Sequence, residues 1–312
     1  MVSIPANEIA HDFSPFFRVY KDGRVERFHN YVYVSPSDNP NTGVKSKDIN
    51  NNSARLYLPK ITENNQKFPL LIYIHGGFSI ESAFSTGHDK YLHSIVSKAN
   101  VVAISVDYRL APEHTLPTCY DDSWAVIKWT ALHVKVCDHL NILPEEFIKE
   151  PWIKDHVDFS RVFLAGDSAG AIIVHDMLVR ASASEKPLGD GFRIVGMALI
   201  HPFFGDDERD EYCLFIFPEC KGLDDPRLNP AAHLRLLSNF VCLKIMVFAA
   251  EKDFLRDRSL TYYDALKKSG WKGEVEIMET QGEDHVFHLL EPTCEKAGLL
   301  MKKLVDFFNE KI

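Results

Sequence analysis

Short apolar runs alternate along most of the chain with longer stretches in which apolar residues recur every three or four positions. The short runs are rich in Val, Ile and Leu, as in strands buried on both faces, and the longer stretches are typical of amphipathic helices. This alternation predicts an α/β fold with a mostly parallel sheet and helices on both faces. The predicted strands are 54–58, 70–74, 101–106, 162–165, 194–200, 245–249 and 275–278, and the predicted helices are roughly 89–99, 120–132, 169–180, 260–269 and 293–309.

Three stretches depart from this alternation of strand-like and helix-like segments. Asp22-Gly23, between two short runs, predicts the turn of a hairpin. Residues 38–52 are rich in Asn, Asp and Lys and predict a surface connection. Residues 203–239 mix acidic residues with Phe, Cys and Pro without a clear period. An insertion of this kind after a sheet strand is a candidate lid.

The composition narrows the class of protein. With 312 residues, 46% of them hydrophobic and 25% charged, the chain is an ordinary globular protein of one large domain or two small ones. The net charge of -9 disfavours nucleic acid and anionic membranes as partners and favours a small neutral ligand. The first residues lack the features of a secretory signal, no apolar run is long enough to span a bilayer, and the six cysteines are scattered. We therefore expect reduced thiols and a cytoplasmic location.

The clearest chemical signature is the stretch GDSAG at 166–170, which joins a predicted strand to a predicted helix. A G-x-S-x-G sequence at such a junction forms a strained turn, in which the glycines avoid collisions and the serine hydroxyl is lifted clear of the sheet. The start of the helix supplies amide groups for a reacting carbonyl. Ser168 is therefore the candidate nucleophile. The alternative is an ordinary Gly-rich turn, because the pentapeptide also occurs by chance.

A serine nucleophile needs a base and a carboxylate that orients the base. Two clusters with acidic residues or histidine follow Ser168, each just after a predicted strand, in the order Ser, Asp, His. Asp253 closely follows its strand and is favoured over Asp257, which is expected within the next helix. His285 comes first after a glycine turn and is favoured over His288.

The second cluster also allows a metal-binding interpretation. Asp284, His285 and His288 are residue types that can ligate zinc. No further candidate ligand lies at helical or hairpin spacing from them. We therefore expect neither a metal ion nor another cofactor.

A glycine-rich loop after the predicted strand 70–74 supplies the third part of the site, with the sequence HGGF. Bare glycines let backbone N–H groups approach a substrate closely. The amides of Gly76, Gly77 and Ala169 are the expected oxyanion hole, which binds the negative oxygen of a tetrahedral intermediate. His75 ends a buried strand, and we expect it to fix the loop rather than to act as a base.

These motifs together resemble the plant carboxylesterase family, in the hormone-sensitive-lipase-like group of alpha/beta-hydrolases. The resemblance covers nearly the whole chain. The motifs that carry it are HGGF at 75–78, SVDYRLAPEH at 105–114, GDSAG at 166–170 and the loops around Asp253 and His285.

The resemblance implies one alpha/beta-hydrolase domain over residues 1–312 with an eight-stranded sheet. It also implies a cap formed by about residues 1–30 and 203–240. It assigns the catalytic triad to Ser168, Asp253 and His285. The further implied feature is a buried scaffold pairing beneath the site, formed by Asp107, Arg109 and Glu113.

The oxyanion loop departs from the family pattern, since most relatives carry HGGGF there. Loss of one oxyanion donor costs about 2.7–4 kcal/mol, so a shortened loop could leave a weak esterase. The same family includes isoflavanone dehydratases with threonine in place of the serine, a gibberellin receptor without the histidine, and cyclases of alkaloid pathways. This chain has both Ser168 and His285, which argues against the receptor and against a dehydratase of the usual form.

We therefore expect a serine carboxylesterase that hydrolyses a small hydrophobic or aromatic ester and acts as a monomer or weak homodimer. The alternatives are a non-hydrolytic lyase or cyclase, methyl-ester cleavage followed by decarboxylation, and, least favoured, a binding-only receptor. The substrate is expected to lie under the cap. The expected pocket residues, each of which could also be core or lid packing, are Phe16, Phe78, Ile80, Phe215 and Val286.

Overall fold

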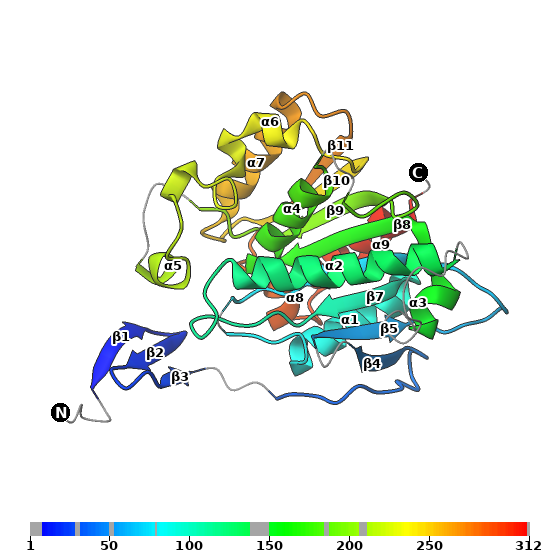
Figure 1. Ribbon diagram of the computed structural model, residues 1–312, viewed down its shortest axis with the longest axis horizontal. Coiled ribbons are helices and arrows are strands. Elements are labelled where there is room, and N and C mark those ends of the chain that lie inside the picture. The colour runs from blue at the N-terminus through cyan, green and yellow to red at the C-terminus, as the bar shows by residue number, and fades with distance from the viewer. Residues whose placement is uncertain are drawn as a thin grey trace.

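A computed structural model of the chain describes residues 8–28, 32–49, 53–78, 80–137, 150–183, 187–205 and 211–310. An eight-stranded sheet forms the centre, and a separate three-stranded sheet lies near the N-terminus (Figure 1). The order in the large sheet is β11-β10-β9-β8-β6-β7-β5-β4, with β4 and β5 antiparallel to their neighbours and the other six strands parallel. Its strands are β4 (Lys45–Ile49), β5 (Ala54–Leu58), β6 (Phe68–Ile74), β7 (Val102–Val106), β8 (Val157–Asp167), β9 (Ile194–Ile200), β10 (Lys244–Ala250) and β11 (Glu274–Thr280).

Helices cover both faces of this sheet, which places a hydrophobic core on each side. Helices α1 (Thr86–Ala99) and α9 (Glu295–Asn309) contribute to one core. Helices α2 (Thr118–Cys137), α3 (Pro151–His156), α4 (Ala169–Ala181) and α7 (Arg256–Lys268) contribute to the other, and α2 and α4 lie in front of the sheet in Figure 1. Because both faces are covered, β6, β7, β9 and β10 are buried along their whole length.

The predicted α/β fold is confirmed, and all seven predicted strands and all five predicted helices overlap observed elements. The prediction for residues 38–52 was wrong over Lys45–Ile49, which form the edge strand β4. This strand carries two lysines and one aspartate, and of its five residues Ser46 and Ile49 are buried. Charged edge strands oppose pairing with other chains, but their sequence is hard to distinguish from that of a polar loop.

The small sheet consists of β1 (Ile9–Phe13), β2 (Phe17–Tyr20) and β3 (Val25–Arg27). The predicted hairpin with its turn at Asp22-Gly23 is confirmed, whereas the exposed strand β1 was not predicted. Phe13 and Phe17 pack against aromatic side chains of α5 (Glu211–Ile216), which lies in the insertion after β9.

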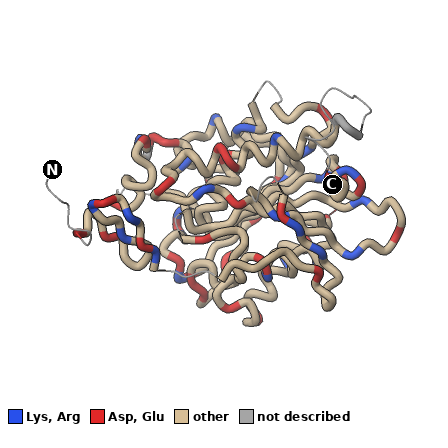
Figure 2. Tube along the Cα trace, turned by 60° about the horizontal axis from the view of Figure 1, so that its bottom comes forward, with Lys and Arg blue, Asp and Glu red and all other residues tan. Residues whose placement is uncertain are grey.

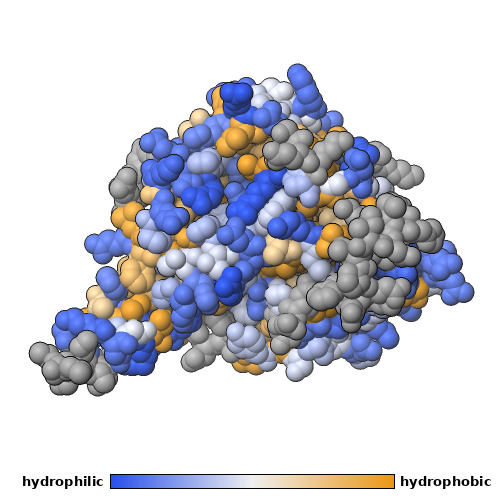
Figure 3. Space-filling model, viewed as in Figure 1, coloured by the Kyte–Doolittle hydropathy of each residue, from blue (hydrophilic) through white to orange (hydrophobic). Residues whose placement is uncertain are grey.

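Apolar side chains gather at the side where this small sheet meets α5 (Figure 3). Acidic and basic residues are interspersed along the trace, including the small sheet (Figure 2). The insertion itself is built of short elements rather than one long helix. After α5 it continues through the turns η2 (Gly222–Asp224) and η3 (Pro230–Ala232) and the helix α6 (Leu234–Leu237), and one further short helix, α8 (Phe287–Leu290), follows β11.

The helices in the described part of the chain are all too short or too polar to cross a membrane.

The packing of α4 against the end of β6 leads to a first prediction. A Cβ added at Gly170 would lie 2.0 Å from the carbonyl oxygen of Ile74, so Gly170→Ala must push two backbone segments apart. We expect the free energy of unfolding to fall by about 1–3 kcal/mol or more in urea titrations. Gly298→Ala in α9 is the matched control, because its Cβ would meet no atom within 4 Å, and it should be neutral or stabilising. Equal stability of the two variants would contradict this account.

Candidate active site

Ser168 lies in a sharp turn between β8 and α4, as the sequence predicts. Its φ of 51° is in the left-handed region, which is strained for a residue other than glycine. Its amide donates to the carbonyl of Ile200 at 2.8 Å, and its own carbonyl accepts from Phe203 at 3.1 Å. Gly166, like Gly170, has no room for a side chain, since a Cβ added there would lie 2.5 Å from the Ile74 carbonyl oxygen. The turn is therefore held from both sides.

Three side chains from three loops meet at this turn. His285 Nε2 lies 2.8 Å from Ser168 Oγ, and His285 Nδ1 lies 2.8 Å from Asp253 Oδ2. The other oxygen of Asp253 accepts the amide of Leu255 at 2.8 Å, so both carboxylate oxygens have donors. The side chain of Asp253 is 1% exposed and that of His285 is 21% exposed. A buried carboxylate, a half-buried imidazole and a hydroxyl thus form one hydrogen-bonded chain that ends at the pocket.

The two disfavoured residues lie elsewhere. Asp257 is in the first turn of α7, where it is largely exposed and pairs with Arg256. His288 is buried in α8 against Tyr91 and His201. Burial and the nearby His88 and His285 lower the pKa of His288 to about 3. Among the described residues, neither Asp257 nor His288 is hydrogen-bonded to Ser168.

The expected oxyanion loop follows β6 and lies beside Ser168. The Oη of Tyr108 donates to the carbonyls of His75 at 2.9 Å and Gly76 at 3.0 Å. In a trans peptide the next N–H points the opposite way, so the amides of Gly76 and Gly77 face away from Tyr108. Among the described residues these two amides and that of Ala169 donate no hydrogen bond, and all three residues line the pocket. Three N–H donors are thus available there.

His75 holds this loop and has no contact with Ser168. It is fully buried, stacks on Tyr108 with ring centres 4.2 Å apart, and donates from Nδ1 to the carbonyl of Gly76 at 2.8 Å. Burial and the neighbouring His88 lower the pKa of His75 to about 3. A neutral, immobile imidazole in this position agrees with the expected loop-fixing role.

A buried polar cluster lies behind the turn and was not predicted. The Oη of Tyr73 donates to Asp167 Oδ1 at 2.6 Å. Burial raises the pKa of Asp167, while His88 and the bond from Tyr73 oppose this rise. Burial by itself would lower the pKa of His88, but its ion pair with Glu81 raises it. The cluster therefore places a buried carboxyl group, whose pKa is subject to opposing influences, next to Ser168.

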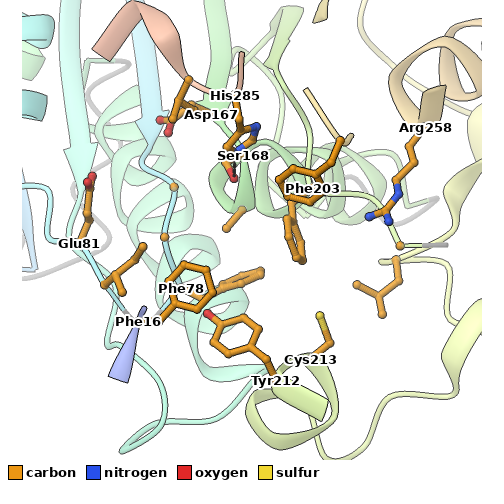
Figure 4. A pocket seen from close by; sticks show the side chains of 18 of the residues that line it. Phe16, Phe78, Glu81, Asp167, Ser168, Phe203, Tyr212, Cys213, Arg258 and His285 are labelled. Atoms are coloured by element: carbon orange, nitrogen blue, oxygen red, sulfur yellow. Dashed lines mark hydrogen bonds between the residues drawn. The ribbon is translucent and has the colours of Figure 1, made fainter. Parts of the chain in front are cut away.

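The pocket above Ser168 has a volume of about 740 Å³ and is mostly apolar. Figure 4 shows Ser168 and His285 at the top of the pocket, Tyr212 and Cys213 at the bottom and Arg258 on the right. Four of the five expected pocket residues line it, namely Phe16, Phe78, Ile80 and Val286.

Phe215 was wrongly expected in this pocket. It faces the small N-terminal sheet, with its ring 4.6 Å from that of His11 and 4.9 Å from that of Phe13. Tyr212 and Cys213 of the same helix line the pocket instead. Without a clear period in the insertion, the sequence could not show which face of α5 turns inward. The other lining residues that the sequence did not single out include Phe203, Phe254, Arg258, Leu289 and Leu290.

The pairing expected between Asp107, Arg109 and Glu113 is not formed. Asp107 accepts hydrogen bonds from Ser82 Oγ and the amide of Ala83. Arg109 binds Asp122 of α2 through two nitrogens, and Glu113 binds Arg27 of β3 in the same way. Each residue thus fixes a different segment, and Arg27 and Glu113 connect the small sheet to the main body.

The possible metal ligands that lie close together in the structure are not the three expected from the sequence. The residues whose ligand atoms lie within 4.8 Å of one another are His201, Asp253 and His285, rather than Asp284, His285 and His288. Asp253 and His285 are bonded directly to each other, and His201 Nδ1 accepts the amide of Val286 at 2.9 Å. These contacts, together with the one between His285 Nε2 and Ser168 Oγ, occupy Oδ2 of Asp253, both ring nitrogens of His285 and Nδ1 of His201.

Comparisons with known proteins agree with this architecture. The family described as alpha/beta hydrolase fold matches residues 71–289. The chain is 40% identical to a 2-hydroxyisoflavanone dehydratase from Glycyrrhiza echinata and 41% identical to probable carboxylesterase 2 from Arabidopsis thaliana, in both cases over 97% of each chain. It shares its fold with an esterase from Rhizomucor miehei, with a TM-score of 0.65 at 22% identity over 89% of this chain and 85% of the other.

The anchoring of the glycine loop gives a second prediction. Tyr108→Phe removes the donor to the carbonyls of His75 and Gly76, so we expect the free energy of unfolding to fall by about 1–3 kcal/mol. Tyr262→Phe is the control, because the buried hydroxyl of Tyr262 has no hydrogen-bond partner among the described residues. Urea unfolding should show little change for the control. A Tyr108→Phe protein as stable as the control would refute this assignment.

The buried imidazole of His288 gives a third prediction, on pH dependence. Its folded-state pKa of about 3 lies below the ordinary value of 6.5, so the unfolded chain binds the extra proton as the pH falls below 6.5. The contribution of His288 to the free energy of unfolding is fully present above that pH and is lost on acidification. The loss between pH 7 and pH 5 is about 2 kcal/mol.

His288→Phe should therefore reduce the acid destabilisation seen in urea unfolding at these two pH values. His114→Phe, at an exposed position, serves as the control and should leave the difference between the two pH values unchanged. The interpretation fails if the His288→Phe protein loses as much stability on acidification as the parent.

Proposed function

Because the chain belongs to the alpha/beta-hydrolase family, we propose that it is a serine carboxylesterase that hydrolyses a small hydrophobic or aromatic ester through an acyl-enzyme. The resemblance to plant carboxylesterases seen in the sequence is confirmed by the relatives described above. The observation that carries the proposal is the hydrogen-bonded chain from Asp253 through His285 to Ser168, which opens into an apolar pocket.

The first step is acylation. Ser168 Oγ attacks the ester carbonyl while its proton passes to His285 Nε2. Asp253 accepts the Nδ1–H of His285, which keeps Nε2 free as the base and stabilises the imidazolium that forms. His285 then gives the proton to the departing alcohol.

The negative oxygen of the tetrahedral intermediate is bound by the amides of Gly76, Gly77 and Ala169. This role is supported by two observations: the three residues line the pocket, and their amides donate no hydrogen bond among the described residues, so they need not break one as the charge develops. Water then attacks the acyl-enzyme with His285 as the base, and the carboxylic acid leaves. Every reacting group in these steps belongs to the chain, the substrate or water, so the proposed reaction requires no cofactor.

The shape and chemistry of the pocket support the substrate class. Rings of Phe16, Phe78, Phe203 and Tyr212 form its walls (Figure 4). Aromatic walls favour flat apolar groups, since offset and edge-on ring contacts add to the burial of apolar area. A volume of about 740 Å³ is in the range of pockets for drug-sized molecules.

The cap belongs to the same proposal, within a single hydrolase domain over residues 1–312. It comprises about residues 1–30 and 203–240, of which 1–7, 29–30 and 206–210 lie outside the described residues. The contacts of Phe13 with Tyr212 and Phe215 support a joint role of the two segments. We also infer a monomer or weak homodimer in the cytoplasm, with no nucleic-acid partner. A reducing compartment is supported by the lack of disulfides among the cysteines of the described residues.

A second candidate is a non-hydrolytic elimination or cyclisation in the same pocket. It is supported by the relative of 40% identity that is named a dehydratase. In this case His285 would act as a base toward the substrate itself, without an acyl-enzyme.

The serine mechanism gives a fourth prediction. Ser168→Ala should lower kcat for 4-nitrophenyl acetate and butyrate by roughly 10⁴-fold or more, because no nucleophile remains. It should also abolish labelling by an organophosphate. Ser238→Ala, a change at a half-buried serine outside the pocket, should leave both properties unchanged. Equal activity of the parent and the Ser168→Ala protein would end the serine-esterase proposal.

Isotope analysis separates the two candidates. Reaction of a natural-product ester in ¹⁸O-labelled water should place one ¹⁸O atom in the acid product if the enzyme is a hydrolase. A product without ¹⁸O that has lost water or formed a ring would support the second candidate.

A further inference from the structure

His201, directly after β9, is a buried side chain beside the candidate triad. It is fully buried, and its φ of 49° is in the left-handed region. Its amide donates to the carbonyl of Phe248 in β10 at 3.0 Å. A non-glycine residue in this conformation costs free energy, so the surrounding contacts must hold it there.

Among the described residues, the ring of His201 makes one hydrogen bond, which it accepts from the loop that carries His285. The amide of Val286 donates to His201 Nδ1 at 2.9 Å. Val286 also has a left-handed φ, of 47°, and it directly follows His285. The rings of His201 and His285 are 5.9 Å apart. Two strained residues are thus joined by one bond next to the base.

We propose that His201 is a positioning residue, whose Nδ1 lone pair fixes the Val286 peptide and thereby the orientation of the His285 imidazole toward Ser168. The inference rests on the proposed role of His285 as the base. Among the described residues, His201 is not hydrogen-bonded to Ser168. It therefore acts through His285 rather than on the substrate.

This role requires one tautomer. An imidazole nitrogen can accept the Val286 N–H only when it carries no proton, so the proton of neutral His201 must be on Nε2. Nε2 is buried and has no hydrogen-bond partner among the described residues. Burial and the neighbouring His288 and His285 hold the pKa of His201 well below its usual value. Nδ1 therefore remains an acceptor at neutral pH.

Three substitutions at this position separate positioning from packing. His201→Asn places a carbonyl oxygen near the site of Nδ1 and tolerates a left-handed φ. His201→Gln places its oxygen nearer the site of Nε2, and His201→Phe keeps a ring without an acceptor. Each protein is titrated with an organophosphate, so that kcat is expressed per reactive site and a loss of folded protein does not count as a loss of catalysis.

We expect kcat per site to fall by about a hundredfold in His201→Phe and His201→Gln with KM little changed, because a shift of about 1 Å in a catalytic group has this effect. His201→Asn should retain most of the activity. Parent-like kcat per site in His201→Phe, or equal losses in all three variants, would overturn the proposal.

A measurement on the unaltered protein covers the case in which the variants do not fold. Long-range ¹H–¹⁵N NMR of the histidine rings reports which nitrogen carries the proton. Protonated Nε2 and unprotonated Nδ1 at His201 are expected at pH 7, and the opposite tautomer would overturn the proposal. This result does not depend on esterase activity, so an inactive parent enzyme would count against the proposed function alone.

Discussion

The close approach of GDSAG to the end of β6 is the contact on which the rest of the site depends. Gly166 and Gly170 have no room for a Cβ because the carbonyl of Ile74 lies against both. The residues that follow Ile74 are His75 and Gly76, the start of the oxyanion loop. One backbone contact therefore fixes the distance between the candidate nucleophile and the amides that would bind the oxyanion. A larger residue at either glycine would separate them.

The order of strands brings the remaining groups to the same edge. β11, β10, β9, β8 and β6 are consecutive neighbours, all parallel, so the loops at their carboxyl ends meet. His285, Asp253, His201 and Ser168 follow the first four of these strands in that order, and the glycine loop follows β6. The buried Asp253 and His201 follow the two strands that lie between those preceding His285 and Ser168. Rigid buried groups thus support the one imidazole that must stay partly exposed to react.

The sequence predicted the parts of the molecule that have a strong local signal. Strands buried on both faces read as apolar runs, and Ser168, Asp253 and His285 were identified because each follows such a run. The edge strand β4 was missed because its charged residues resemble a loop, and Phe215 was misplaced because α5 has no clear period. The partners of Arg109 and Glu113, and the role of His201, depend on contacts between segments more than ten residues apart, which spacing alone does not reveal.

The HGGF loop, the proposed oxyanion loop, is held by hydrogen bonds to its carbonyls. Three successive carbonyls accept hydrogen bonds: those of His75 and Gly76 from Tyr108, and that of Gly77 from the amides of Ile80 and Glu81 at 2.8 and 3.2 Å. Each bound carbonyl turns the next N–H in the opposite direction. The number of glycines matters less than these anchors, because a side chain on Phe78 does not prevent its amide from donating. A loop with one glycine fewer can therefore still present a row of donors, provided that Tyr108 keeps its place.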